Sequence, residues 1–230
     1  LGLLNNAIPF TLIGVAVIYL NASIAAILNA TTPFFTATVA TLWLGEAFGL
    51  RRLIGIVLGI AGVTILVGWS PLPLNAQTLM AAGAALLAAF SYGVATVYAR
   101  DRFVGVQPLH TAIGQLTGST LLLMPLALVQ LPGATLTLPI ALAVLALALL
   151  CTAFAYLLFF ELIASAGATQ AASVTFLVPM FSVLWGVLLL GEPLSAGMLV
   201  GLAVILTSVW LVLGTGPLRP RRHLRARATP

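Results

Sequence analysis

Polar side chains recur at helical spacing within an apolar stretch near the start of the sequence. Asn29, Thr32 and Thr36 lie in the run 23–43 at positions i, i+3 and i+7, so a helix would place them on one face. Amide and hydroxyl groups on one helix face either line a cavity or form hydrogen bonds with neighbouring helices. Both interpretations are open, and the three residues are candidates for contacting a small-molecule substrate.

A second polar stripe and two tyrosines extend this set of candidates. Thr175 and Ser182 share a face of the run 168–190. Tyr92 and Tyr156 lie in two other apolar runs, where an aromatic ring with a hydroxyl group can stack on a solute and form a hydrogen bond with it. All four side chains are candidates for lining a cavity, and for Thr175 and Ser182 hydrogen bonding between helices is the alternative.

Three glutamates lie at the ends of apolar runs or inside one, where a carboxylate can have a structural or a functional role. Glu46 and Glu192 each follow a glycine at the end of an apolar run. A carboxylate there can accept hydrogen bonds from free amides at a helix N-terminus, which is a structural role, and gating or ion coupling is the alternative. Glu161 lies inside an apolar run and is a candidate proton site, although its side chain can also extend to the membrane interface.

Residues that bind metals or perform covalent catalysis are sparse. His110 and His223 have no Cys, Asp or Glu at ligand spacing, so we expect no metal site. The sequence contains no glycine-rich phosphate loop, nucleophile elbow or paired acid motif. We therefore expect no cofactor, and the sequence argues against an enzyme.

The composition of the chain requires lipid as its solvent. Apolar residues make up 62% of the 230 positions and charged residues 6%, with a mean hydropathy of +1.21. A water-soluble domain of this composition would expose a large apolar surface. The apolar runs, divided at Gly, Pro, Asn and Arg, predict an all-α membrane bundle. Its eight predicted spans are 2–20, 23–43, 52–69, 77–98, 108–130, 137–163, 168–190 and 195–214.

Arginines gather on one side of the predicted membrane. Arg51 and Arg52 precede or open the third span, Arg100 and Arg102 follow the fourth, and the basic tail 215–230 follows the eighth. Because basic residues near helix ends stay in the cytoplasm, both ends of the chain are predicted to be cytoplasmic in a multi-pass protein of the inner membrane. The lipid bilayer is an expected partner and nucleic acid is not, while the oligomeric state is open.

An internal repeat relates the two parts of the chain. Residues 23–67 align without a gap on residues 169–213, at an offset of 146 positions. The alignment pairs Leu44-Gly45-Glu46 with Leu190-Gly191-Glu192. By alternation of the spans, the first motif is cytoplasmic and the second lies outside, so the repeats are inverted. Inverted repeats are typical of secondary transporters, whose halves open a central site alternately to the two sides.

Two prolines also match at this offset. Pro33 and Pro179 lie at equivalent points of the two copies. A proline within a helix frees a carbonyl group and permits a kink, which would suit a rocking motion of the two halves. Packing defects without a functional role are the alternative.

The repeated motifs resemble the drug/metabolite transporter superfamily, in its EamA-domain branch. The resemblance rests on Pro33-Phe34-Phe35-Thr36 with Leu42-Trp43-Leu44-Gly45-Glu46, and on Gly167-Ala168-Thr169 with Pro179 and Leu190-Gly191-Glu192-Pro193-Leu194-Ser195. It implies ten helices in two inverted halves of five. Eight are recognised in this sequence, so two more are expected before Leu1.

The resemblance also implies a division of the chain. Residues 1–69 would hold the last three helices of the first repeat, 70–76 a short outer loop, 77–214 the five helices of the second repeat, and 215–230 a basic cytoplasmic tail. Without two preceding helices, Asn5 and Asn6 would be poorly satisfied, and transport by this chain alone is expected to be weak.

The expected function is secondary transport by alternating access, and the resemblance implies efflux of small metabolites or amphiphilic compounds. One alternative is an intramembrane enzyme that modifies lipid head groups. Another is a membrane assembly subunit without transport activity.

Overall fold

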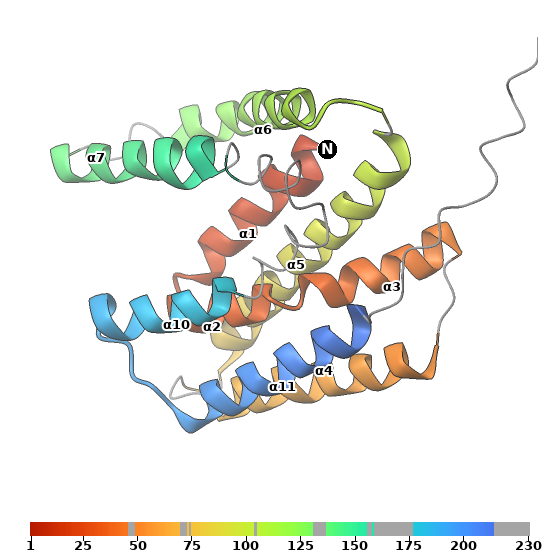
Figure 1. The fold of residues 1–230 in the computed structure, drawn as a ribbon. Helices are drawn as coiled ribbons and strands as arrows, with labels where there is room; N and C mark the ends of the chain where they lie inside the picture. Colours follow the sequence, from red (N-terminus) through yellow and green to blue (C-terminus); the bar gives the residue numbers. More distant parts are fainter. Residues whose placement is uncertain are drawn as a thin grey trace, which may run out of the picture.

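The computed structural model describes residues 1–45, 49–69, 73, 75–103, 105–130, 137–155, 158 and 177–213. Within these residues helices are the only regular secondary structure, which confirms the predicted all-α membrane bundle (Figure 1). The helical segments are η1 (Leu3–Ala7), α1 (Ile8–Ala16), α2 (Ala22–Asn29), α3 (Thr32–Leu44), α4 (Leu50–Gly68), α5 (Ala76–Arg102), α6 (Pro108–Gln130), α7 (Leu138–Ala146), η3 (Leu147–Phe154), α10 (Leu177–Leu190) and α11 (Ala196–Leu213). The segments η1 and η3 are π-helical.

Each predicted span contains one apolar helix or pair of helices. Within the described residues, three helical stretches are long and apolar enough to cross a membrane, namely Ala22–Leu44, which joins α2 and α3, Ala76–Arg102 and Leu109–Val129. The shorter apolar helices in the described part of the chain are Leu3–Ala16, Leu53–Gly68, Leu138–Phe154, Leu177–Leu190 and Ala196–Leu211. A crossing requires about 20 helical residues, so the predicted spans around these helices include turns or residues outside the described ranges.

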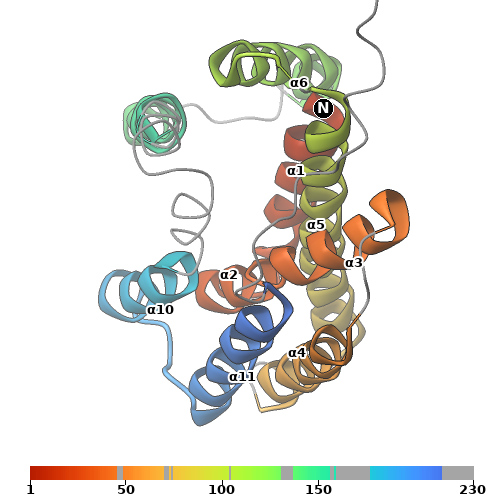
Figure 2. The ribbon, with the colours of Figure 1, turned by 45° about the vertical axis from the view of Figure 1, so that its right-hand side comes forward.

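Helices α4 and α11 form an antiparallel pair and lie side by side in both views (Figure 1, Figure 2). The guanidinium of Arg51, at the start of α4, lies 5.0 Å from the ring centroid of Trp210, near the end of α11. The two helices approach closely because glycines of α4 face side chains of α11.

The glycine contacts of this pair have an exchange symmetry. A Cβ atom on Gly62 would lie 2.8 Å from Cγ1 of Ile205, and one on Gly59 would lie 2.8 Å from Oγ of Ser208. At the offset of 146, position 62 matches 208 and position 59 matches 205. When each position is replaced by its match in the other copy, the contact between 62 and 205 becomes the contact between 208 and 59. Two surfaces that are related by a twofold axis have this property.

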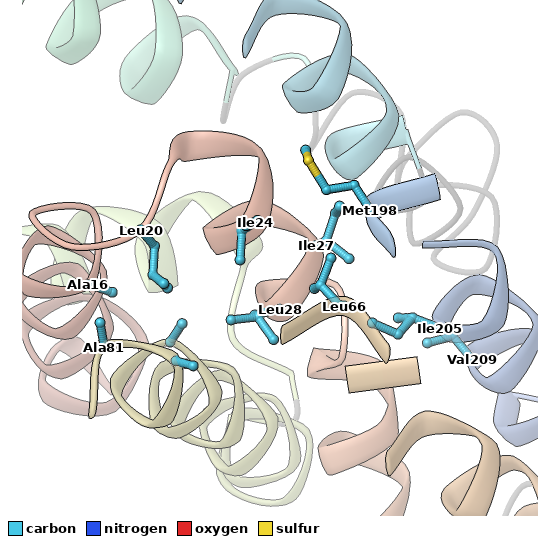
Figure 3. Close-up of a cluster of buried hydrophobic side chains, with 12 residues drawn as sticks. Ala16, Leu20, Ile24, Ile27, Leu28, Leu66, Ala81, Met198, Ile205 and Val209 are labelled. Carbon is cyan, nitrogen blue, oxygen red and sulfur yellow. The ribbon is translucent and has the colours of Figure 1, made fainter. Parts of the chain in front are cut away.

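A buried apolar cluster joins the short helix α2 to its neighbours (Figure 3). Ile24, Ile27 and Leu28 of α2 are fully buried and belong to the same cluster as Leu66 of α4 and Ile205 of α11. Helices in lipid associate mainly through such close packing and hydrogen bonds. Although α2 has only eight residues, it is thus held between longer helices.

A polar contact joins η1 to α6. The side-chain amide of Asn5 donates a hydrogen bond to Oε1 of Gln115 at 3.0 Å. The expectation that Asn5 is poorly satisfied is therefore wrong, because α6 supplies an acceptor. Asn6 is 1% exposed, and neither of its side-chain polar atoms has a partner in the structure as described, as expected from sequence.

Candidate functional site

A cavity of about 250 Å³ lies beside the junction of α2 and α3. This volume is slightly below the roughly 300–1,000 Å³ of pockets that bury drug-sized ligands, so the cavity suits a smaller solute. Its lining comes from η1, α2, α3, α5 and α10 and the residues that join α2 to α3. The lining residues are Asn5, Asn29, Ala30, Thr32, Pro33, Tyr92, Thr96 and Val178. No charged side chain is among them.

The helix beside this cavity is broken. The α-helical backbone is interrupted at Ala30 and Thr31, between the end of α2 and the start of α3. Pro33 lies in the first turn of α3, where its missing amide group leaves no hydrogen bond unmade. The predicted span 23–43 is present as the helical stretch Ala22–Leu44, and the kink expected at Pro33 takes the form of a two-residue interruption just before this proline.

Threonine hydroxyl groups compensate for the break. The hydroxyl of Thr31 donates to the carbonyl oxygen of Leu28 at 2.6 Å, and that of Thr32 donates to the carbonyl oxygen of Asn29 at 2.7 Å. The last carbonyl groups of α2 thereby gain side-chain donors, and the carbonyl oxygen of Leu28 also accepts from the backbone amide of Thr31 at 3.1 Å. Thr36 donates to the carbonyl oxygen of Thr32 at 2.9 Å within α3, so it bonds to its own helix and is absent from the cavity lining.

Asn29 lines the cavity and carries an unsatisfied acceptor. Its Oδ1 atom is buried and has no hydrogen-bond partner among the described residues. A buried amide oxygen without a partner costs about 1–3 kcal/mol. If the Asn29 side chain turns this atom toward the cavity, an N–H or O–H group on a bound solute would remove the cost, and Asn29 would then orient a solute that donates a hydrogen bond.

The predicted cavity residues separate into three groups. Asn29, Thr32 and Tyr92 line the cavity, and their role in binding stays a prediction. Thr36 and Ser182 make hydrogen bonds elsewhere. The cavity candidates Tyr156 and Thr175 lie outside the described residues, as do Glu46, predicted to have a structural or gating role, and Glu161, the candidate proton site.

Sequence reasoning missed two of the polar lining residues. Thr96 follows Tyr92 by four positions on α5, so helical spacing from the tyrosine would have indicated it. Asn5 was recognised only as a residue in need of a partner. Its place in the cavity depends on the packing of η1 against α6, for which a local pattern gives no signal.

The carboxylate of Glu192 binds the N-terminus of α2. The amide of Ala22 donates to Oε1 at 2.7 Å, and the amide of Ser23 donates to Oε2 at 3.1 Å. The hydroxyl of Ser23 also donates to Oε2. Two free amides of α2 are thereby satisfied by a negative charge, which is favourable at this end of a helix. The expected amide-binding role is present, but the helix is α2 of the other repeat.

Ser182 of α10 adds a fourth contact to the same end of α2. Its hydroxyl donates to the carbonyl oxygen of Ala22 at 3.2 Å. In return, the hydroxyl of Ser23 lies 3.3 Å from the carbonyl oxygen of Ser182. The stripe residue Ser182 thus joins two helices, which is one of the two roles considered from sequence.

The Gly-Glu motif has a backbone explanation. Gly191 follows α10 with a φ of 65°, a left-handed conformation that favours glycine. The amide of Glu192 then donates to the carbonyl oxygen of Gly186 at 3.0 Å, so the chain turns back onto the last turns of α10. Gly45 ends α3 with a φ of 64°, so both glycines of the motif have the same conformation.

A comparison with protein families matches this chain over most of its length. The model of the EamA-like transporter family covers residues 1–68 and 79–214. The chain belongs to the EamA-like transporter family. Membership makes it a multi-pass integral membrane protein and points to a transporter rather than an enzyme.

Three relatives of this family member are similar over most of its length. It is 31% identical over 214 residues to the uncharacterized transporter YvbV of Bacillus subtilis (strain 168), which covers 91% of this chain and 69% of that protein. It is 22% identical to the uncharacterized transporter YoaV of the same strain, over 81% of this chain and 64% of the other. It is 28% identical to the WAT1-related protein At3g02690, chloroplastic, of Arabidopsis thaliana, over 84% of this chain and 48% of that protein. The chain therefore spans between about half and seven tenths of these relatives.

Proposed function

We propose that this protein is a secondary transporter whose cavity holds a small solute and opens alternately to the two sides of the membrane. The observation that carries this proposal is that Thr32 and Val178 line one cavity. They are matching positions of the repeat, at the offset of 146. A site where equivalent points of two inverted repeats meet is the arrangement that alternating access requires.

Two further features support this proposal. The contacts between α4 and α11 exchange under the repeat, as expected if a twofold axis in the membrane plane relates the two parts. The helix break between α2 and α3 places irregular backbone at the cavity, and such discontinuous helices are common at transporter binding sites.

The cavity chemistry favours an uncharged solute. Its polar groups are amides and hydroxyls, such as those of Asn5, Asn29 and Thr32, and its described lining has no charge to pair with an ion. An unpaired charge in the low-dielectric interior of a membrane protein is costly. A second cavity of about 330 Å³ lies on the other side of the first turn of α3 and includes the rings of Phe34 and Phe35. An uncharged solute with both polar and apolar parts fits these surroundings.

The direction and membrane that we propose for transport rest on sequence features. The arginine distribution favours a cytoplasmic C-terminus in an inner membrane, and the resemblance to drug/metabolite transporters implies efflux. We therefore propose export of small uncharged metabolites or amphiphilic compounds, without an ATP-binding site.

Counterflow in liposomes tests this function. The full chain is reconstituted into vesicles loaded with an unlabelled probe, and entry of the labelled probe is followed. The probes are uridine and benzamide, which are uncharged, tetraphenylphosphonium, a cation, and benzoate, an anion. We expect weak but saturable exchange of an uncharged probe, in line with the weak transport expected of this chain alone, and no exchange of the ions. Exchange of ions alone would overturn the proposed chemistry, and no exchange of any probe would overturn transport.

A pair of variants ties the exchange to the cavity. Asn29→Leu removes the buried acceptor with little change in volume, and we expect exchange at low probe concentration to fall by roughly tenfold, the effect of about 1.4 kcal/mol. Val57→Ile lies on an exposed face of α4, away from the cavity, and should exchange as the unmodified protein does.

A further inference from the structure

Glu192 and α2 form a contact between segments about 170 positions apart. Ala22 and Ser23 belong to the first half of the chain, and Glu192 follows α10 in the second. Hydrogen bonds with a charged acceptor are about twice as strong as neutral ones. The contact is therefore a strong but localised connection between the two halves, at the end of α2 that lies away from the cavity.

The opposite end of the same helix lines the cavity. Helix α2 runs from Ala22, at the glutamate, to Asn29, whose Oδ1 atom is the unsatisfied acceptor. Eight residues at about 1.5 Å per residue make a rod of roughly 12 Å. Helix α2 ends at the break before α3, and it is held by its buried side chains and by the contacts at its two ends.

We propose that Glu192 is a positioning residue that acts through α2. Its carboxylate holds the start of α2 against the end of α10, closes the cavity on that side of the membrane, and fixes Asn29 at the cavity wall. The contact breaks when the cavity opens to that side. This inference rests on the proposed transport function, and the arginine distribution predicts that the closed side is the outer one.

Gly186 provides a way to disturb the closed contact without removing a polar group. A Cβ atom at this position would lie 2.3 Å from Oγ of Ser23 and 2.5 Å from Oε2 of Glu192. The closed contact therefore requires glycine on α10 at this point. Gly186→Ala should prevent closure by steric overlap, whereas Glu192→Gln should weaken it by removing the charge. Steric overlap in one variant and loss of the charge in the other are thus both expected to open the contact.

The rate at which a reporter cysteine in the cavity is labelled from each side of the membrane shows whether the contact is closed. A reporter cysteine, Asn29→Cys in a Cys151→Ser background, is labelled with a membrane-impermeant thiol reagent in right-side-out and inside-out vesicles. The reporter should react mainly from the side opposite Glu192. We expect Glu192→Gln and Gly186→Ala to increase the labelling rate from the glutamate side by about five- to tenfold and to lower the rate from the other side, as a population shift requires.

Controls separate this role from a loss of structure. Gly14→Ala places a methyl group in open space on α1 and should leave both rates unchanged. Glu192→Asp keeps the charge, so its ratio of labelling rates from the two sides should be closer to that of the unmodified protein than the ratio of Glu192→Gln. A variant that only disturbs folding would raise labelling from both sides together, so a reciprocal change is the diagnostic readout.

A disulfide tests the same contact in the opposite direction. Cysteines introduced together as Ser23→Cys and Gly186→Cys, in the Cys151→Ser background, are close enough to be joined in the closed state. Oxidation should stop counterflow of the active uncharged probe, and reduction should restore it. Counterflow that continues after complete oxidation would overturn the proposal. So would unchanged sidedness in both Glu192→Gln and Gly186→Ala. Normal sidedness shifts without any counterflow would overturn the transport function instead.

Discussion

Thr32 and Val178 line the same cavity although they lie 146 positions apart in the sequence. Each precedes a proline by one position, Pro33 in the first turn of α3 and Pro179 near the start of α10. The matching points of the repeat therefore meet, and the cavity lies between them. Its described lining is mainly apolar, with a few amide and hydroxyl groups and no charge, which is the composition typical of a small-molecule site.

Cysteine accessibility distinguishes a water-filled cavity from a sealed one. In a Cys151→Ser background, Thr32→Cys and Tyr92→Cys should react with a small aqueous thiol reagent roughly tenfold faster than Val57→Cys, because the reactive thiolate forms in water and not in lipid. Val57 is 58% exposed on α4, on a surface that we expect to face lipid. Equal protection of all three cysteines would show that the cavity is closed to water on both sides.

Close packing of α4 against α11 should make Gly62 sensitive to one added methyl group. Gly62→Ala would place a Cβ atom 2.8 Å from Cγ1 and 3.1 Å from the backbone nitrogen of Ile205, and we expect a loss of about 1–3 kcal/mol in the free energy of unfolding. Gly83→Ala is the matched control, since α5 leaves open space there. The melting temperature in detergent measures both, and a similar response of the two variants would contradict the proposed packing.

Substitution by leucine should change the stability of the protein in opposite directions at Asn5 and at Asn6. Asn5→Leu removes the hydrogen bond to Gln115 and should lower the free energy of unfolding by about 1 kcal/mol. Asn6→Leu removes two buried polar atoms that have no described partner and should raise it by a similar amount. Thermal unfolding of the two purified variants shows whether each substitution lowers or raises the free energy of unfolding. Destabilisation by Asn6→Leu would show that its amide has a partner, such as a buried water molecule.

The inverted arrangement predicts the side on which loop residues lie. Single cysteines at Leu50→Cys and Gly105→Cys should be labelled only from the cytoplasm, and Leu194→Cys only from outside, in a Cys151→Ser background. Leu194 follows α10 and is 53% exposed. Labelling of Leu50→Cys and Leu194→Cys from the same side would contradict the inverted repeat.

The helical elements were predictable because the environment is lipid. With no water to bond to its amide and carbonyl groups, a spanning backbone has to satisfy them within the segment, and a helix does this. The predicted spans 52–69 and 108–130 accordingly contain α4 and α6 with nearly the same bounds. The glycines of the repeated Gly-Glu motif were also meaningful in sequence, since Gly45 and Gly191 both adopt a conformation that other residues avoid.

The break between α2 and α3 could not be inferred from its sequence alone. Pro33 is compatible with a kinked helix and with the first turn of a new one. The choice depends on partners outside the segment, including Glu192, which binds the N-terminus of α2, and Ile205, which packs in the same buried cluster. Such partners are not encoded in the local pattern.

The sequence by itself determined the class of the protein, its helices, its repeat and the polar residues Asn29, Thr32 and Tyr92 as candidates. These properties follow from composition and local spacing, which depend on the chemistry of neighbouring residues in the chain. The tertiary structure decided that Asn5 pairs with Gln115 and that the carboxylate of Glu192 binds α2. Those contacts join residues more than 100 positions apart, and they depend on how whole helices pack, which no single segment specifies.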